Sequence, residues 1–216
     1  MTCTRQPECK VQSVVILAAL DISATFDTLD HTTLINRLEH IFGITDVALR
    51  WINSYVSERL QFVAIEQSKS NVTRCEFGVP QGSMLGLILF PLYIAPVANV
   101  LSSFHVSHHQ YADNSQLNIA ANRDNIQMKL DLLRDCTAAL NDWFLLNGLS
   151  LNPDKSEILL LGIAAKLRTI EAVGQVSVTS ASINTTDFIK NLGVFLDSWL
   201  TFHKYVGKVC QSSYAT

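Results

Sequence analysis

Val14-Val-Ile-Leu-Ala-Ala-Leu20 is an uninterrupted apolar run, and Asp21 follows it directly. A short run of this kind is typical of a buried β-strand, which we expect at about residues 12–20. A second acid, Asp113, lies at the polar tip of a predicted hairpin with strands near residues 105–111 and 115–119. Adjacent strands would bring both carboxylates to one end of a sheet, where they repel unless a cation lies between them. Mg²⁺ prefers such oxygen ligands.

The composition indicates a folded, globular chain. Of 216 residues, 48% are hydrophobic and 16% charged, which excludes intrinsic disorder. Sixteen Lys and Arg against 19 Asp and Glu give a net charge of -3, which argues against a stand-alone nucleic-acid binder but permits a local basic groove. The five cysteines form no C-x-x-C pair, so we expect a reduced intracellular protein, in the nucleus or cytoplasm.

Helices and strands are predicted throughout the chain. Helices are expected at about residues 30–43, 46–55, 83–101, 122–148 and from 202 onward, with Asp30 and Asn122 as N-caps of the first and fourth. Further strands are expected at about 60–65, 72–77, 157–161, 175–179 and 191–196, with turns at Gln67-Ser-Lys-Ser-Asn and Asn152-Pro-Asp. Pro91 and Pro96 interrupt the apolar segment at 83–101, so we expect a buried core helix and no membrane span. The order indicates an α+β fold with helices packed on an antiparallel sheet.

Five motifs identify a family resemblance. They are Leu20-Asp-Ile-Ser-Ala-Thr-Phe-Asp-Thr-Leu-Asp-His, Gly78-Val-Pro-Gln-Gly-Ser-Met-Leu-Gly, Tyr111-Ala-Asp-Asn, Leu151-Asn-Pro-Asp-Lys-Ser-Glu and Asn191-Leu-Gly-Val. In this order, and over residues 14–203, they resemble the palm motifs of non-LTR (LINE-type) retrotransposon reverse transcriptases. The resemblance implies that residues 1–216 are part of a right-hand polymerase palm, with the fingers and thumb truncated.

The resemblance also implies a catalytic centre. In this family the acids at the positions of Asp21 and Asp113 bind two Mg²⁺ or Mn²⁺ ions, which lower the pKa of the primer 3′-hydroxyl and neutralise the triphosphate. Lys155 resembles a lysine that protonates or binds pyrophosphate, although a solvated turn cation explains it equally well. Asn114 stands where the family has a second acid of the turn.

Further positions resemble residues that contact the incoming nucleotide or the template. These nucleotide-binding candidates are Ile22, Ser23, Ala24, Thr25, Phe26, Gln81 and Gly82. Backbone N–H groups of the first segment would cradle phosphate oxygens, and Phe26 would lie under the sugar and exclude a ribose 2′-hydroxyl. Gln81 and Gly82 have an ordinary loop before a helix as their alternative explanation. Asn191-Leu-Gly-Val resembles a turn that supports the primer end, or else is a core strand with a bulge at Gly193.

Three substitutions depart from the family pattern. Asn114 replaces an acid, which removes one negative charge from the metal site and costs roughly 10²-fold or more in rate. Leu87 replaces a usual proline, and Thr25 a usual alanine.

The resemblance implies an RNA-directed DNA polymerase of a mobile element, truncated and impaired, that takes an RNA template, a DNA primer and dNTP. The alternative is a non-catalytic remnant that serves as an interaction or weak nucleic-acid-binding module. Both hypotheses stay open at this stage, as does the oligomeric state.

Overall fold

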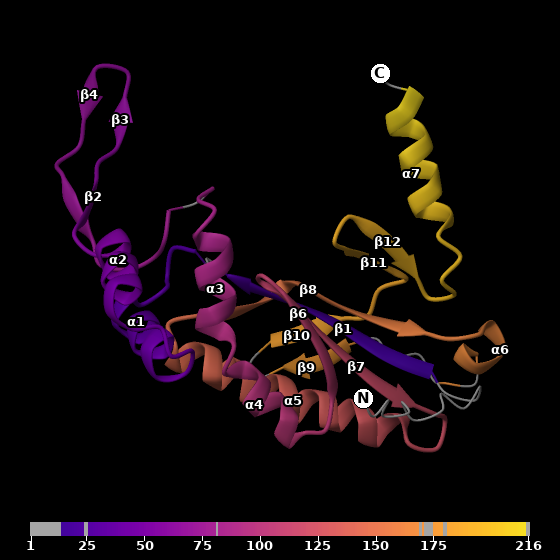
Figure 1. Cartoon of the computed structure of the whole chain (residues 1–216). Helices are drawn as coiled ribbons and strands as arrows, with labels where there is room; N and C mark the ends of the chain where they lie inside the picture. Colours follow the sequence, from indigo (N-terminus) through magenta and orange to yellow (C-terminus); the bar gives the residue numbers. More distant parts are fainter. Residues whose placement is uncertain are drawn as a thin grey trace, which may run out of the picture.

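A four-stranded antiparallel sheet forms the centre of the computed structural model, which describes residues 14–23, 26–80, 82–168, 170, 175–178 and 181–214. The strand order is β6-β7-β1-β8 (Figure 1). The strands are β1 (Val14–Ser23), β6 (Ser107–Tyr111), β7 (Asn114–Ala121) and β8 (Ser150–Leu161). The predicted hairpin around Asp113 is therefore confirmed as β6 and β7, and β1 lies directly beside it.

Five helices contribute to the main core on one face of this sheet. They are α1 (His31–His40), α2 (Asp46–Val56), α3 (Gly86–Ile94), α4 (Val97–Ser103) and α5 (Ile126–Leu146), with α2 packed on α1. Alternate side chains of a strand point to opposite faces, so every second residue of β1 enters this core. The core joins Ile16, Ala18, Leu20 and Ile22 of β1 to Leu89, Phe90 and Tyr93 of α3 and Leu133, Leu140 and Phe144 of α5. The predicted α+β architecture is confirmed.

A short hairpin packs on the opposite face of the sheet. Its strands are β11 (Phe188–Asn191) and β12 (Val194–Asp197), and its Ile189 is buried with Leu17 and Leu159 of the sheet. The single strand predicted at 191–196 is thus wrong. Leu192 and Gly193 have φ values of +46° and +87°, and this left-handed pair turns the chain back on itself. Helix α7 (His203–Tyr214) follows.

The apolar segment at 83–101 forms two helices instead of the one predicted. Pro96 precedes α4 with φ fixed at −62° and lacks an N–H, so it interrupts the helical hydrogen-bond ladder. By length and composition alone, Gly86–Ser103 would suffice to cross a membrane, with a mean hydropathy of 1.6. A buried core helix has the same composition, and Leu89, Phe90 and Val97 lie in the main core.

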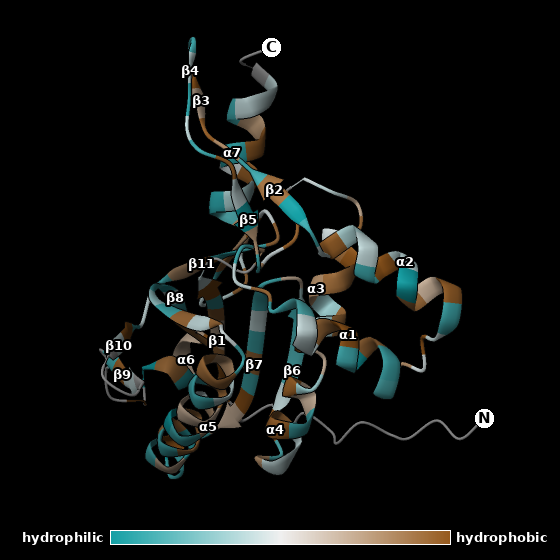
Figure 2. Cartoon of the chain, turned by 90° about the vertical axis from the view of Figure 1, so that its left-hand side faces the viewer, coloured by the Kyte–Doolittle hydropathy of each residue, from teal (hydrophilic) through white to brown (hydrophobic). Residues whose placement is uncertain are grey.

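Residues 59–75 form a hairpin arm that stands away from the body in both views (Figures 1 and 2). Its strands are β2 (Arg59–Gln61), β3 (Ala64–Ile65), β4 (Ser68–Lys69) and β5 (Thr73–Cys75), with β2 paired to β5 and β3 to β4. The turn was expected at Gln67-Ser-Lys-Ser-Asn, but Ser68 already pairs with Ile65. Glu66, with φ of +52°, makes the tighter turn possible.

The start of α5 differs from the prediction. Asn125, and not Asn122, is the N-cap of α5; the Asn122 side chain instead accepts hydrogen bonds from the backbone N–H groups of Asp124 and Asn125.

The remaining elements are α6 (Ala164–Leu167), β9 (Gln175–Val178) and β10 (Ala181–Asn184). Strands β9 and β10 pair with each other in antiparallel fashion.

Candidate active site

Asp21 and Asp113 lie at the same end of the central sheet. Leu20 pairs with Ser115, which places Asp21 next to the start of β7, and Asp113 occupies the turn that joins β6 to β7. Burial raises the pKa of Asp21 above its ordinary value; nearby Lys155 lowers it, and Asp113 raises it further. The structure therefore brings two carboxylates and one ammonium group within electrostatic range of one another.

A bulge in β8 carries Lys155 to this position. Ala19 pairs with Glu157, whereas Asp21 pairs with Asn152, so β8 has additional residues between the two pairs. The bulge is closed by Ser156, whose Oγ accepts a hydrogen bond from the Asp21 backbone N–H (3.1 Å) and donates one to the Asn152 carbonyl (2.7 Å). The turn predicted at Asn152-Pro-Asp is thus a bulge within one edge strand, where a proline is tolerated.

Asn114 is exposed and hydrogen-bonded to the neighbouring Asp113. Its side-chain Nδ2 donates to Asp113 Oδ1 over 3.3 Å. In the part of the chain that the structure describes, no three His, Cys, Asp or Glu residues gather into a possible metal site. Asp21 and Asp113 thus contribute two carboxylates at this end of the sheet, and their two negative charges would balance one divalent cation.

The segment directly after Asp21 is partly buried. The Ile22 side chain lies in the main core and is not available to a ligand, and Ile22 pairs with Leu151 of β8. Ser23, the last residue of β1, is half-buried. Ala24 and Thr25, which were also predicted to contact the nucleotide, lie outside the described residues.

Phe26 is held in place by a close backbone contact with the next motif. Its ring packs against Phe90 of α3 with centroids 5.6 Å apart, and its carbonyl accepts a hydrogen bond from Val79 N–H over 2.7 Å. Gly78 has φ of +78°, and a Cβ there would lie only 2.7 Å from the Phe26 carbonyl oxygen. Only glycine allows the backbone of residue 78 to come this close to Phe26. This contact fixes the Phe26 ring relative to the loop before α3.

The other predicted nucleotide contacts, Gln81 and Gly82, follow Val79 in the chain. Gly82 is exposed, with φ of +76° and open space where a Cβ would stand, so its backbone conformation, not crowding, favours glycine. Gln81 lies outside the described residues.

A contact between Gln116 and Asn191 was missed from the sequence. Gln116 faces Ala19 on the sheet face that also carries Asp21, and its Nε2 donates to Asn191 Oδ1 over 2.5 Å. Asn191 ends β11, immediately before the Leu192-Gly193 turn. The amide pair thus ties the strand that leaves the Asp113 turn to the β11–β12 hairpin. The sequence gives only a weak signal for this contact, because Gln116 is one of several polar residues in β7.

The comparison with protein families decides the assignment. The family model described as reverse transcriptase (RNA-dependent DNA polymerase) matches residues 2–196. The chain belongs to the reverse transcriptase family. Members of this family generally use divalent metal ions, in agreement with paired carboxylates at the end of the sheet.

Similar reverse transcriptases come from mobile elements of flies. The chain is 27% identical over 202 residues to the "RNA-directed DNA polymerase from mobile element jockey" of Drosophila funebris, an alignment covering 91% of this chain and 21% of that protein. It is 25% identical over 204 residues to the "Probable RNA-directed DNA polymerase from transposon BS" of Drosophila melanogaster, covering 90% and 21%. The chain spans about a fifth of the length of these relatives.

Solved telomerase structures share the fold. A telomerase from Candida tropicalis, truncated from its C-terminal domain, superposes with a TM-score of 0.61 at 16% identity and covers 90% of this chain and 36% of that one. Telomerase from Candida albicans, solved with a fragment of telomeric RNA, gives 0.52 at 15% identity, covering 93% and 34%. At such low identity the likeness establishes the palm-like fold alone.

Proposed function

We propose that this chain is the palm of an RNA-directed DNA polymerase of a mobile element, which transfers nucleotides at Asp21 and Asp113. The convergence of these two carboxylates at one end of the sheet is the observation that supports the proposal most strongly. The substrates would be dNTP and a DNA primer paired to an RNA template. The printed names of the fly relatives describe the same activity.

The donor set at this end of the sheet fits a divalent cation. Asp21 and Asp113 would hold Mg²⁺ or Mn²⁺ through carboxylate oxygens, and a second ion would take its additional ligands from the triphosphate. Bound ions supply charge neutralisation and a lower pKa for the primer 3′-hydroxyl. Asn114 offers an uncharged amide oxygen where a third carboxylate would bind more strongly.

The surrounding residues orient the substrates. Phe26, fixed by Val79 and Phe90, would support the sugar of the incoming nucleotide and exclude a 2′-hydroxyl. Lys155 lies close enough to Asp21 to influence its pKa, so its ammonium group could also stabilise the leaving pyrophosphate. The Gln116 and Asn191 pair would fix the β11–β12 turn against the catalytic sheet.

Primer extension on an RNA template tests this proposal. We expect slow extension by the parent chain with Mn²⁺ and loss of that activity in Asp21→Asn, which keeps the side-chain shape. Asp124→Asn, an exposed change before α5, is the matched control and should extend as the parent does. Equal extension by Asp21→Asn and the parent would refute the assignment.

Asn114 favours a second candidate function, a non-catalytic nucleic-acid-binding module. One charge fewer beside Asp113 weakens the electrostatic attraction for a divalent ion. This candidate predicts a folded parent chain that binds primer and template but extends nothing with either ion. Extension by the parent that is lost in Asp21→Asn would exclude it.

A further inference from the structure

The hairpin arm has one polar face and one mixed face at its base. In the β2–β5 pair, Arg59 faces Cys75, Leu60 faces Arg74, and Gln61 faces Thr73. Because successive side chains of a strand point to opposite faces, Arg59 and Gln61 share one face with Thr73 and Cys75. The arm thus presents a guanidinium, an amide and a hydroxyl group side by side.

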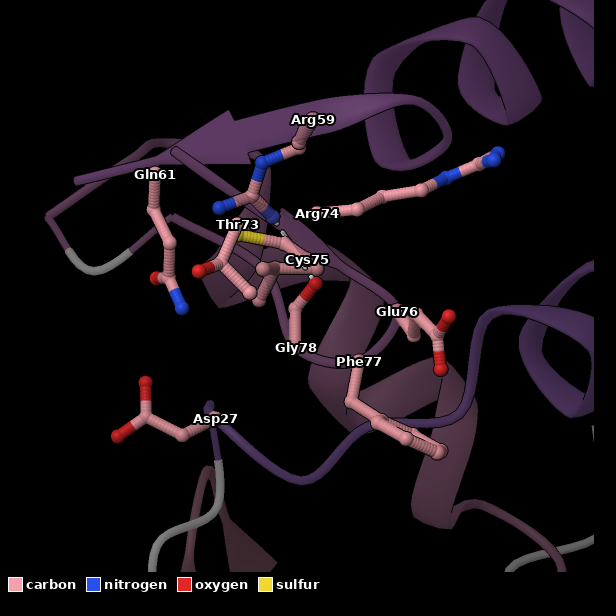
Figure 3. Close-up of a pocket in the computed structure, with 10 residues that line it drawn as sticks. Asp27, Arg59, Gln61, Thr73, Arg74, Cys75, Glu76, Phe77 and Gly78 are labelled. Atoms are coloured by element: carbon pink, nitrogen blue, oxygen red, sulfur yellow. Dashed lines mark hydrogen bonds between the residues drawn. The ribbon is translucent and has the colours of Figure 1, made fainter. Parts of the chain in front are cut away.

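This polar face lines a cavity of about 700 Å³ between the arm and the loop after β1. Figure 3 shows Arg59, Gln61 and Thr73 along one side and Asp27 across from them. Arg59 is half-buried, and its Nη1 donates a hydrogen bond to the Gly78 carbonyl over 3.0 Å. Its guanidinium is therefore held at the cavity wall and is not a mobile surface charge.

The cavity adjoins the predicted nucleotide-binding loops. Asp27 follows Phe26 directly, and the Gly78-Val79 backbone lines the cavity while Val79 N–H is bonded to the Phe26 carbonyl. The same backbone leads within a few residues to Gly82. A ligand in the cavity would therefore lie beside the predicted site of the incoming nucleotide.

The chemistry of the lining suits a nucleotide within a strand. Arg59 would donate to a phosphodiester oxygen, while Gln61 and Asp27 offer both donors and acceptors to the edge of a base. A wall with only cationic side chains would favour phosphate alone, whereas this combination of charged and amide side chains would also contact the base. The volume lies within the range of pockets that enclose small ligands, which is about 300–1,000 Å³.

We propose that this cavity binds an unpaired nucleotide of the single-stranded template beside the copying site. The inference rests on the proposed polymerase function, because a template strand is what a polymerase must guide there. A free nucleoside triphosphate presents similar phosphate and base groups and is the competing source of the ligand.

Fluorescence anisotropy without divalent ions tests the proposal separately from catalysis. The probes are a blunt primer–template duplex and the same duplex with a single-stranded template overhang. We expect the parent to bind the overhang probe more tightly, and Arg59→Gln and Gln61→Ala each to reduce this preference about 5- to 10-fold. Arg59→Gln should also lower the salt dependence of overhang binding by about 0.7 in slope.

Lys69→Gln is the matched control, because it removes a cation from the tip of the same arm, outside the cavity. It should retain the preference for the overhang. Gln61 is exposed and its loss should leave the fold intact, which circular dichroism would check. Equal binding of both probes by the parent, unchanged preference in Gln61→Ala, or displacement of the overhang by free dNTP would overturn the proposal. Failure of extension with an intact overhang preference would instead refute only the polymerase function.

Discussion

Replacing Asn114 by Asp should strengthen divalent-ion binding at the sheet end. The new carboxylate would stand beside Asp113 in place of an amide that now donates to it over 3.3 Å. A unit negative charge and a divalent cation about 4 Å apart attract by about 2 kcal/mol in water and about 8 kcal/mol at an effective dielectric constant of 20. Asn114 is exposed, so the lower figure is the better guide.

Repulsion between the new carboxylate and Asp113 is present both with and without the ion, so to a first approximation it cancels from the difference in Mg²⁺ binding between the variant and the parent. We therefore expect a net gain of about 2 kcal/mol, which is about 30-fold in the Mg²⁺ dissociation constant. The gain should be smaller at high ionic strength, because exposed charges are screened.

Isothermal titration calorimetry with Mg²⁺ measures this difference directly. Asn118→Asp is the matched control: it adds the same charge to the same strand, four residues farther from the turn and on the same sheet face as Asn114. We expect Asn118→Asp to change the Mg²⁺ affinity by less than about threefold. If Asn114→Asp bound Mg²⁺ no more tightly than the parent or the control, the ion would not lie at this turn.

Three further predictions concern stability and positioning. Because folding raises the pKa of Asp21 above its ordinary value of 3.8, the stability of the metal-free chain falls as the pH rises above 3.8. Metal-free Asp21→Asn should therefore resist urea better than the parent at pH 7, and this difference should vanish below pH 3.8. Gly78→Ala should lower the free energy of unfolding by at least about 2 kcal/mol, because its Cβ would lie 2.7 Å from the Phe26 carbonyl oxygen. Gly43→Ala, at φ of +66° in open space, should lower it by about 1 kcal/mol in the same urea titration. Equal costs would contradict the close contact between Gly78 and Phe26. A double-mutant cycle of Gln116→Ala and Asn191→Ala, also by urea unfolding, should give a coupling of about 0.5–1.5 kcal/mol, and additive effects would show that their hydrogen bond contributes nothing.

Local signals in the sequence predicted the centre of the fold well. The apolar run before Asp21 is strand β1, and the polar tip around Asp113 is the β6–β7 turn. Asp30 was predicted as an N-cap, and its Oδ1 accepts a hydrogen bond from Thr33 N–H over 2.6 Å. In each case short-range chemistry and the tertiary structure favour the same conformation.

Features set by tertiary contacts were not predictable in the same way. Leu192 adopts a left-handed conformation that leucine does not favour, so the residue types alone did not decide between a turn and a bulged strand at Asn191-Leu-Gly-Val, where the structure has the β11–β12 turn. The β8 bulge depends on Ser156, which bonds to a strand more than a hundred residues away in the chain. The cavity beside Arg59 likewise joins two segments whose proximity depends on the Gly78 contact.

Mn²⁺ binding, followed by electron paramagnetic resonance, tests most directly whether Asp21 and Asp113 form one site. The parent, Asp21→Asn and Asp113→Asn would be titrated under identical conditions, with Asp124→Asn as the control. The paired-carboxylate centre predicts that each of the two active-site variants weakens Mn²⁺ binding at least about tenfold while the control matches the parent. Retention of parental affinity by either variant would contradict a shared metal site at this end of the sheet.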